Sequence, residues 1–290
     1  MGLDFHSPRE ILMNLDNDLY AAALSCLLIS APDEKIKLAP KLQAAWLAGE
    51  LIRSPQAEPA QKIESPGRPT RPELVLPKQM KQRKLHHLEG RIALLHAVAH
   101  IEFNAINLAL DAVYRFREMP DAYYNDWLQV AAEEAYHFVL VRTRLRELGA
   151  DYGDLPAHNG LWEHALKTDH DVLVRMALVP RVLEARGLDV TPPMMARLQE
   201  VGDTRTAEVL AIILRDEVGH VRMGSHWYRY CCELRGLEPE STFRQLLREV
   251  LQAPVRGPFY TEGRLQAGFS VSELEQLQQL EENWLAEISV

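Results

Sequence analysis

Four glutamates and two histidines recur along the chain in a pattern typical of metal ligands. Each half of the pattern is a lone glutamate followed by a Glu-x-x-His pair: Glu102, Glu134 and His137, then Glu184, Glu217 and His220. Residues three apart on an α-helix lie on the same face, so each pair directs both side chains to one side. The lone glutamate precedes its pair by 32 residues in the first half and by 33 in the second. The spacing indicates two similar helix pairs, each carrying three ligands.

The ligand set determines the expected chemistry. Four carboxylates and two imidazoles are used by carboxylate-bridged di-iron and di-manganese sites inside four-helix bundles. Carboxylate oxygens balance the charge of two divalent ions, and one imidazole per metal leaves positions open for dioxygen. We expect two Fe ions, with Mn as the alternative metal. The first three ligands would serve one ion and the last three the other, with two of the acids bridging.

A further acid immediately precedes each Glu-x-x-His pair, Glu133 in the first and Asp216 in the second. Histidines that bind metals usually donate their second N–H to a carboxylate. We expect Asp216 to accept this hydrogen bond from His137, and Glu133 to accept it from His220. Plain surface exposure of the two acids is the alternative.

The simplest competing interpretation is a set of buried salt bridges, for example between Glu184 and Arg181, nearly one helical turn earlier. Single glutamates on helices are usually solvated, and one Glu-x-x-His match is common by chance. Two pairs, two preceding acids and near-equal spacings within apolar stripes favour the metal interpretation.

Other side chains carry weaker signals. His96 and His100 are four residues apart and would suit zinc, but they lie well round the helix from Glu102. Trp127 is expected in the core. The basic run of Lys78, Lys81, Arg83 and Lys84 is predicted to be the solvated start of a helix, with a site for an anionic partner as the alternative. Three tyrosines could be redox-active near a metal, although buried hydrogen-bonded tyrosine is commoner: Tyr114, Tyr136 and Tyr228.

Composition predicts an ordinary soluble protein. The chain has 290 residues, of which 47% are hydrophobic and 25% charged, and its net charge is −9. That charge argues against a general nucleic-acid binder, which would need a basic footprint to neutralise phosphates, but it leaves room for a local basic groove. Three cysteines, two of them adjacent, form neither a disulfide framework nor a metal-binding spacing. With no signal peptide or membrane span expected either, we predict a cytoplasmic protein.

The ligands require helices that bring them to one level. Apolar periodicity predicts four bundle helices: 79–118, 122–148, 170–187 and 203–234. At a rise of ~1.5 Å per residue, Glu102 and Glu134 lie at similar distances from the turn between the first two helices. Matching distances to the helix ends predict that the second and third helices are parallel. A long crossover over 150–167, holding a short helix at 161–166, would connect them as in ferritin-like bundles.

The third bundle helix is expected to be irregular. Thr168 or Asp169 is predicted to cap its first turn. Pro180 should kink it, and Gly187 should end it. A short helix over 192–201 would then continue onward from the break.

Outside the bundle the sequence predicts helical extensions, so the fold class is all-α throughout. Residues 1–77 hold helices over 8–30 and 33–51 and a proline-rich connector packed on the bundle, and residues 78–236 form the bundle. Residues 237–290 form a tail with a helix over 240–251, an irregular stretch rich in Gly and Pro over 254–268, and a last helix. Ser270 or Ser272 would cap the last of these. The pattern assigns no chemistry to this tail.

The chain resembles the bacterial ferritin-like family called domain of unknown function 455. The resemblance is carried by five stretches: PGRPTRPELVLP, EGRIALLHAVAHIEFNAINLALDAVYRF, AAEEAYHF, RMALVPRVLEARGLDVTPPM and RDEVGHVRMGSHW. It covers nearly the whole chain, and all six ligand positions match. It implies a ferritin-like bundle with a dinuclear metal site but no established reaction. More distantly, the chain is similar to tRNA-modifying di-iron hydroxylases.

These observations lead to three functional hypotheses. The first is an oxygen-activating di-iron oxygenase or hydroxylase that uses dioxygen, an unknown substrate and an electron donor. The second is an iron-oxidising or metal-handling protein without an organic substrate. The third is a structural bundle stabilised by metal. The sequence leaves open which electron donor is used, whether the substrate is a nucleic acid and whether the chain forms a homodimer. No membrane association is expected.

Overall fold

The computed structural model describes residues 17–55, 58–81, 83–251 and 255–287. Within these ranges the chain is all-helical, with isolated bridges in place of any β-strand, which confirms the predicted all-α class. The first part of the helix predicted over 8–30 lies outside the described residues. The chain divides into two compact units, residues 1–166 and 167–290, which we describe separately.

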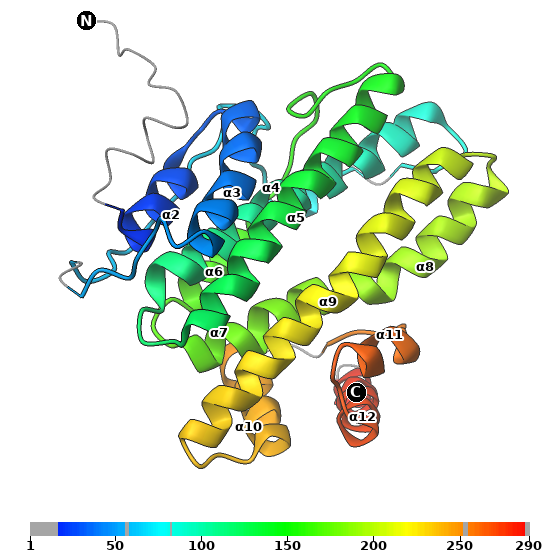
Figure 1. Ribbon diagram of the computed structural model, residues 1–290. Coiled ribbons are helices and arrows are strands. Elements are labelled where there is room, and N and C mark those ends of the chain that lie inside the picture. Colours follow the sequence, from blue (N-terminus) through cyan, green and yellow to red (C-terminus); the bar gives the residue numbers. More distant parts are fainter. Residues whose placement is uncertain (1–16, 56–57, 82, 252–254, 288–290) are drawn as a thin grey trace, which may run out of the picture. The chain divides into compact units, whose positions relative to one another are not determined.

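The long helices of the first unit are α2 (Leu19–Leu28), α3 (Pro32–Leu47), α4 (Leu88–Arg115) and α5 (Asp121–Glu147). α4 and α5 pack along each other as an antiparallel hairpin, α3 packs on α5, and α2 packs on α4 (Figure 1). Every residue from 102 to 114 is buried. A helix buried on all sides lies at the centre of its unit, so α4 is the core helix, and Glu102 begins its fully buried part.

Most of the predicted helix ends lie close to the observed ones. α5 starts and ends one residue earlier than predicted and is followed by Gly149 at a φ of +86°. α3 ends at Leu47 instead of residue 51, because Gly49 takes a φ of +71° and turns the chain. The short crossover helix is present as α6 (Gly160–Lys167).

The start of α4 corrects the prediction, because the helix begins at Leu88 and not at residue 79. A 3-10 turn, η1 (Pro77–Gln79), precedes a basic segment outside any helix. Basic side chains in a first helical turn are repelled by the positive end of the helix dipole. The chain at Lys84 also folds back onto Gly90, where a Cβ would lie 2.0 Å from the Lys84 carbonyl oxygen. A continuous helix through Lys84 would remove this contact.

A buried lysine ties the connector to the helices of the first unit. The Nζ of Lys35 on α3 donates hydrogen bonds to the carbonyl oxygens of Leu27 (2.9 Å) and Gly67 (2.7 Å). It also donates to the side-chain oxygen of Asn107 on α4. The described part of 53–76 has no helix, as the prolines predict. Three acceptors around one amine fix the connector at Gly67 to three helices.

His96 and His100 are structural residues of the first unit. The ring Nε2 of His96 accepts a hydrogen bond from the backbone N–H of Gly153 at 3.0 Å. The ring Nδ1 of His100 lies 2.9 Å from the hydroxyl of Tyr152. Both rings also stack on that tyrosine. They hold the loop after α5 against α4, which assigns them a packing role in place of the zinc alternative.

We expect His96 to make the first unit sensitive to acid. Burial lowers the pKa of His96 below its ordinary value of 6.5, and accepting the Gly153 hydrogen bond requires a neutral ring. The unfolded chain therefore binds this proton at a higher pH than the folded protein. The stabilisation is complete above the unfolded pKa and is lost as the pH falls through the lower, folded one.

Thermal unfolding between pH 7.5 and pH 5 measures this effect. The wild type should lose more stability on acidification than the variant His96→Gln, whose amide does not titrate. Equal losses in the two proteins would contradict the assignment.

The second unit is built on one long helix and a broken partner. The partner consists of α7 (Val172–Leu178), a π-helical turn η2 (Val179–Glu184) and α8 (Ala185–Glu200), and it runs along α9 (Thr204–Leu234) (Figure 1). The tail adds α10 (Pro239–Leu246), a second π-turn η3 (Leu247–Leu251), α11 (Thr261–Gln266) and α12 (Val271–Glu287). α10 packs on α7 and α9, and α11 packs on α8 and α9.

The broken partner corrects three predicted details. Asp171, not Thr168 or Asp169, caps α7, and its carboxylate accepts from the Leu173 N–H at 2.7 Å. The irregularity at Pro180 is a π-turn rather than a simple kink. Gly187 does not end the helix, because its φ lies outside the left-handed region and α8 continues through it.

The tail corrects one prediction and confirms another. α11 lies in a stretch predicted to be irregular. The predicted capping by Ser270 is confirmed: its hydroxyl accepts from the N–H of Glu273, and the carboxylate of Glu273 accepts from the N–H of Ser270. This reciprocal pair is a capping box.

All three cysteines are buried and free. Burial raises the pKa of the Cys26 thiol to about 12 and that of Cys231 to about 11. Burial also raises the pKa of Cys232. These thiols are therefore protonated at neutral pH, as expected for core residues.

By length and hydropathy, one described helix, α4, could cross a membrane. Of its apolar window, 67% is buried inside the protein. That is the behaviour of a core helix and is consistent with a soluble protein.

Candidate metal centre

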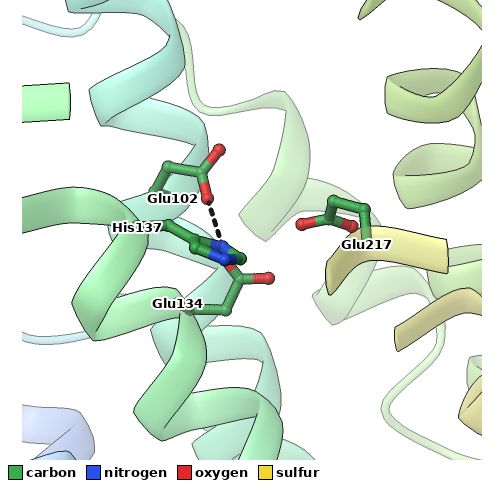
Figure 2. Close-up of side chains that lie close together, drawn as sticks. All are labelled: Glu102, Glu134, His137 and Glu217. Atoms are coloured by element: carbon green, nitrogen blue, oxygen red, sulfur yellow. Dashed lines mark ion pairs between the residues drawn. The ribbon is translucent and has the colours of Figure 1, made fainter. Parts of the chain in front are cut away.

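The first three predicted ligands lie together in the first unit. Glu102 comes from α4, and Glu134 and His137 come from α5 (Figure 2). The Nδ1 of His137 lies 3.3 Å from a carboxylate oxygen of Glu102 and 3.5 Å from one of Glu134. One ligand atom from each of the three lies within 4.8 Å of the others. The side chains of Glu134 and His137 are completely buried, and Glu102 is 3% exposed.

The helix hairpin explains why these residues meet. Thirteen residues separate Glu102 from the end of α4 at Arg115, and thirteen separate the start of α5 at Asp121 from Glu134. At ~1.5 Å per residue, both acids lie ~20 Å from the turn. The predicted common level of the two glutamates is therefore confirmed within this hairpin.

Negative charge from two carboxylates surrounds the imidazole of His137. Burial lowers the pKa of His137, but hydrogen bonds and charges from Glu102 and Glu134 outweigh burial and raise it to about 11. The imidazole without metal is therefore a cation between two acids. Burying two carboxylates is costly unless positive charge accompanies them.

This donor set fits a divalent metal. Two carboxylates and one imidazole converge within the reach of one ion, and these are the donor types that iron and manganese accept. A metal would replace the proton on His137 as the positive charge. A buried cluster of Glu and His side chains that could hold a metal is therefore present.

The second Glu-x-x-His pair repeats the geometry of the first within the second unit. On α9 the Nδ1 of His220 lies 3.5 Å from a carboxylate oxygen of Glu217, the same separation as in the Glu134–His137 pair. His220 is completely buried, and the side chain of Glu217 is 12% exposed. The i,i+3 spacing thus gives the same local arrangement in both halves.

Glu184 occupies the last position of the π-turn η2. The residue as a whole is half-buried, and its carboxylate Oε2 atom is buried. π-turns inside α-helices are rare and occur frequently at functional sites, because the extra residue redirects a side chain. Arg181, its partner in the salt-bridge alternative, instead donates to Glu273 of α12.

Family comparison places these geometries in context. The family described as "Protein of unknown function (DUF455)" matches residues 28–275. The chain belongs to the DUF455 family. An "Uncharacterized protein" of Haemophilus influenzae strain Rd is 48% identical over 221 residues, covering 74% of this chain and 77% of the relative. No solved structure matches. All six ligand positions of this DUF455 chain lie inside the matched range.

The two acids predicted to orient the histidines have neighbours on their own helices. Glu133 accepts a hydrogen bond from the side chain of Gln129 at 2.9 Å. Asp216 pairs with the exposed Arg215 at 2.8 Å. Their predicted bonds to the opposite histidines stay predictions for this DUF455 chain.

The remaining candidates are mostly structural. Tyr114 accepts from the N–H of Gln61, Tyr228 donates to the carbonyl oxygen of Pro239, and Tyr136 is 51% exposed. Trp127 is 2% exposed, which confirms its place in the core. The basic side chains of the run at 78–84 are exposed.

Sequence reasoning missed a contact that fixes the second half of the ligand set. A Cβ on Gly224 of α9 would lie 2.3 Å from the ring of Pro180 in η2. Gly224 follows His220 by four residues, and Pro180 precedes Glu184 by four. The signal available was a glycine inside one predicted helix and a proline inside its neighbour. Only a glycine allows this approach, so the contact sets the spacing of two helices one turn from a ligand on each.

Proposed function

We propose that the protein is a dinuclear metal carboxylate protein, with iron as the metal and manganese as the alternative. Glu102, Glu134 and His137 would serve one ion, and the three equivalent residues of the second unit the other. The supporting observation is the buried cluster in the α4–α5 hairpin, together with the same Glu-x-x-His geometry on α9. In this proposal the fold is the ferritin-like four-helix bundle that the sequence predicts.

The proposed activity is that of an oxygenase or hydroxylase with an unknown substrate. A bound iron pair would supply dioxygen activation, and an external electron donor would be required. The chain's own contribution is to hold the ions with charged ligands in a site closed to bulk water, where every electrostatic interaction is stronger. Complete burial of His137 and His220 supports such a site.

Metal analysis followed by rapid mixing with oxygen tests this function. We expect about two iron ions per chain after purification or anaerobic loading with Fe(II), as the six-ligand set of such sites implies. The reduced protein should then give a transient absorption band on mixing with oxygen and should oxidise a C–H bond in a substrate screen.

The outcomes separate the proposed function from its alternatives. Oxidation of many more than two Fe(II) per chain, with the product retained, would favour metal handling. Two bound ions that stabilise the fold but do not react with oxygen would favour a structural metal. No binding of either Fe(II) or Mn(II) would leave the six residues as a polar network and overturn the proposal.

A further inference from the structure

The first observation is that the π-turn of the second unit holds a buried arginine whose partners come largely from the tail. Arg181 is 1% exposed, and its guanidinium donates to the carboxylate of Glu273 on α12. Its Cζ lies 4.5 Å from the ring centre of Phe269, 4.3 Å from Phe243 and 4.8 Å from Tyr228. Three aromatic rings and one carboxylate therefore surround this cation.

A second buried ion pair joins the tail to the helix after the π-turn. Arg264 of α11 donates to both carboxylate oxygens of Asp189 on α8, at 2.9 and 2.8 Å. Asp189 also accepts from the backbone N–H of Tyr260 at 2.9 Å. Both charged side chains are completely buried. A two-bond arginine–carboxylate pair fixes orientation as well as distance.

The two ion pairs lie on either side of a proposed metal ligand. Glu184 follows Arg181 by three residues and precedes Asp189 by five. In each pair one member belongs to the helix that carries Glu184, and the other belongs to the tail at 261–287. The tail therefore holds this helix immediately before and after the ligand.

The burial cost indicates that these contacts do more than add stability. Among the described residues, Nε and Nη1 of Arg181 and Nη1 of Arg264 are buried with no hydrogen-bond partner. Burying a charge with incomplete hydrogen bonding is unfavourable, and apolar side chains of similar size often serve stability better. A π-turn, in turn, is an uncommon conformation that needs support from its surroundings.

We propose that the C-terminal tail is a positioning element of the metal centre, with Glu273 and Arg264 holding the π-turn in the conformation that presents Glu184 to the metal. This inference rests on the proposed function, and it assigns a role to a part of the chain that carries no ligand of its own. Glu273 and Arg264 act through the helix and not by touching metal.

Two conservative variants of the full-length chain test this role. Glu273→Gln and Asp189→Asn each remove one charge from one tail contact at nearly constant volume. The matched control is Asp171→Asn, which weakens a two-bond ion pair with Arg235 in the same unit, at 2.6 and 2.8 Å. Asp171 lies at the opposite end of α7 from the π-turn.

Metal stoichiometry, metal affinity and amide hydrogen exchange over 179–186 are measured for each protein. Both Glu273→Gln and Asp189→Asn should exchange their backbone amide hydrogens faster than the wild type in this segment. Their affinity for the second ion should fall about tenfold or more, as for other residues that orient ligands, while the first ion stays bound. The control should match the wild type in both measurements.

The outcomes distinguish this inference from the function on which it rests. A wild type without metal would overturn the proposed function. If the wild type binds two ions and both variants bind the second ion with unchanged affinity, only the role of the tail is overturned. If Asp189→Asn does not fold, Arg264→Lys replaces it, because lysine keeps the charge but not the two-bond geometry.

Discussion

Replacing Glu134 by glutamine is expected to abolish tight metal binding and leave the metal-free fold intact. Glu134 is completely buried, and its carboxylate lies 3.5 Å from His137. The amide keeps the size of the side chain but loses the charge that a divalent ion needs. Removal of one ligand should lower affinity by about a hundredfold or more, equivalent to ~2.7 kcal/mol.

Without metal, the same substitution should have little effect on stability. It removes one of two acids near a protonated imidazole, so lost attraction to His137 is offset by lost repulsion from Glu102. We expect a change within about 1 kcal/mol. A wild-type protein at a metal concentration about a thousand times its Kd would gain about 4 kcal/mol of stability, and the variant would not.

Calorimetric titration and thermal unfolding with and without Fe(II) or Mn(II) measure both effects. Glu147→Gln is the matched control, since this acid lies at the end of the same helix, away from the cluster, and pairs with Arg144 at 3.0 Å. Retention of wild-type affinity by Glu134→Gln would exclude Glu134 as a ligand. Collapse of the metal-free variant would instead favour a structural salt-bridge network.

Placing a methyl group on Gly224 is expected to separate α9 from the π-turn. The new Cβ would lie 2.3 Å from the Cβ and Cγ of Pro180, and a proline ring cannot rotate away. Overpacking of this kind typically costs about 1–3 kcal/mol. Because the contact lies one turn from both His220 and Glu184, the second metal should also bind at least about tenfold more weakly.

Gly219→Ala is the control on the same helix, because its added Cβ meets nothing within 4 Å. There, alanine should stabilise the helix by about 0.5–1 kcal/mol through its higher helix propensity. Denaturant unfolding and metal titration of both variants give the comparison. A Gly224→Ala protein as stable as Gly219→Ala would show that α9 and η2 adjust freely, and that the contact does not position the ligands.

The sequence was most informative about helices whose apolar residues repeat at one regular spacing from end to end. Apolar spacing predicts the limits of α5 and α9 to within one residue, and the common level of Glu102 and Glu134 follows from helix rise alone. These features depend on local preferences and fixed geometry. For this reason, the spacing of Glu102, Glu134 and His137 along the chain was enough to predict that they meet.

Features decided by distant contacts could not be predicted in this way. The start of α4 coincides with the return of Lys84 onto Gly90, and the π-turn contacts Gly224 and the tail residue Glu273, which lies 92 positions from Arg181. α11 is a six-residue helix that the buried Arg264–Asp189 pair joins to α8. Tertiary packing overrides local signals at such points.

The distribution of thiols gives each unit an internal reporter of its own opening. The first unit has Cys26, and the second has Cys231 and Cys232, all buried and all with raised pKa values. Alkylating reagents attack the exposed thiolate, so in the native protein each cysteine reacts only when its surroundings open. Mass spectrometry of alkylated peptides would thus read the opening of the two units separately, in one sample and without an engineered label.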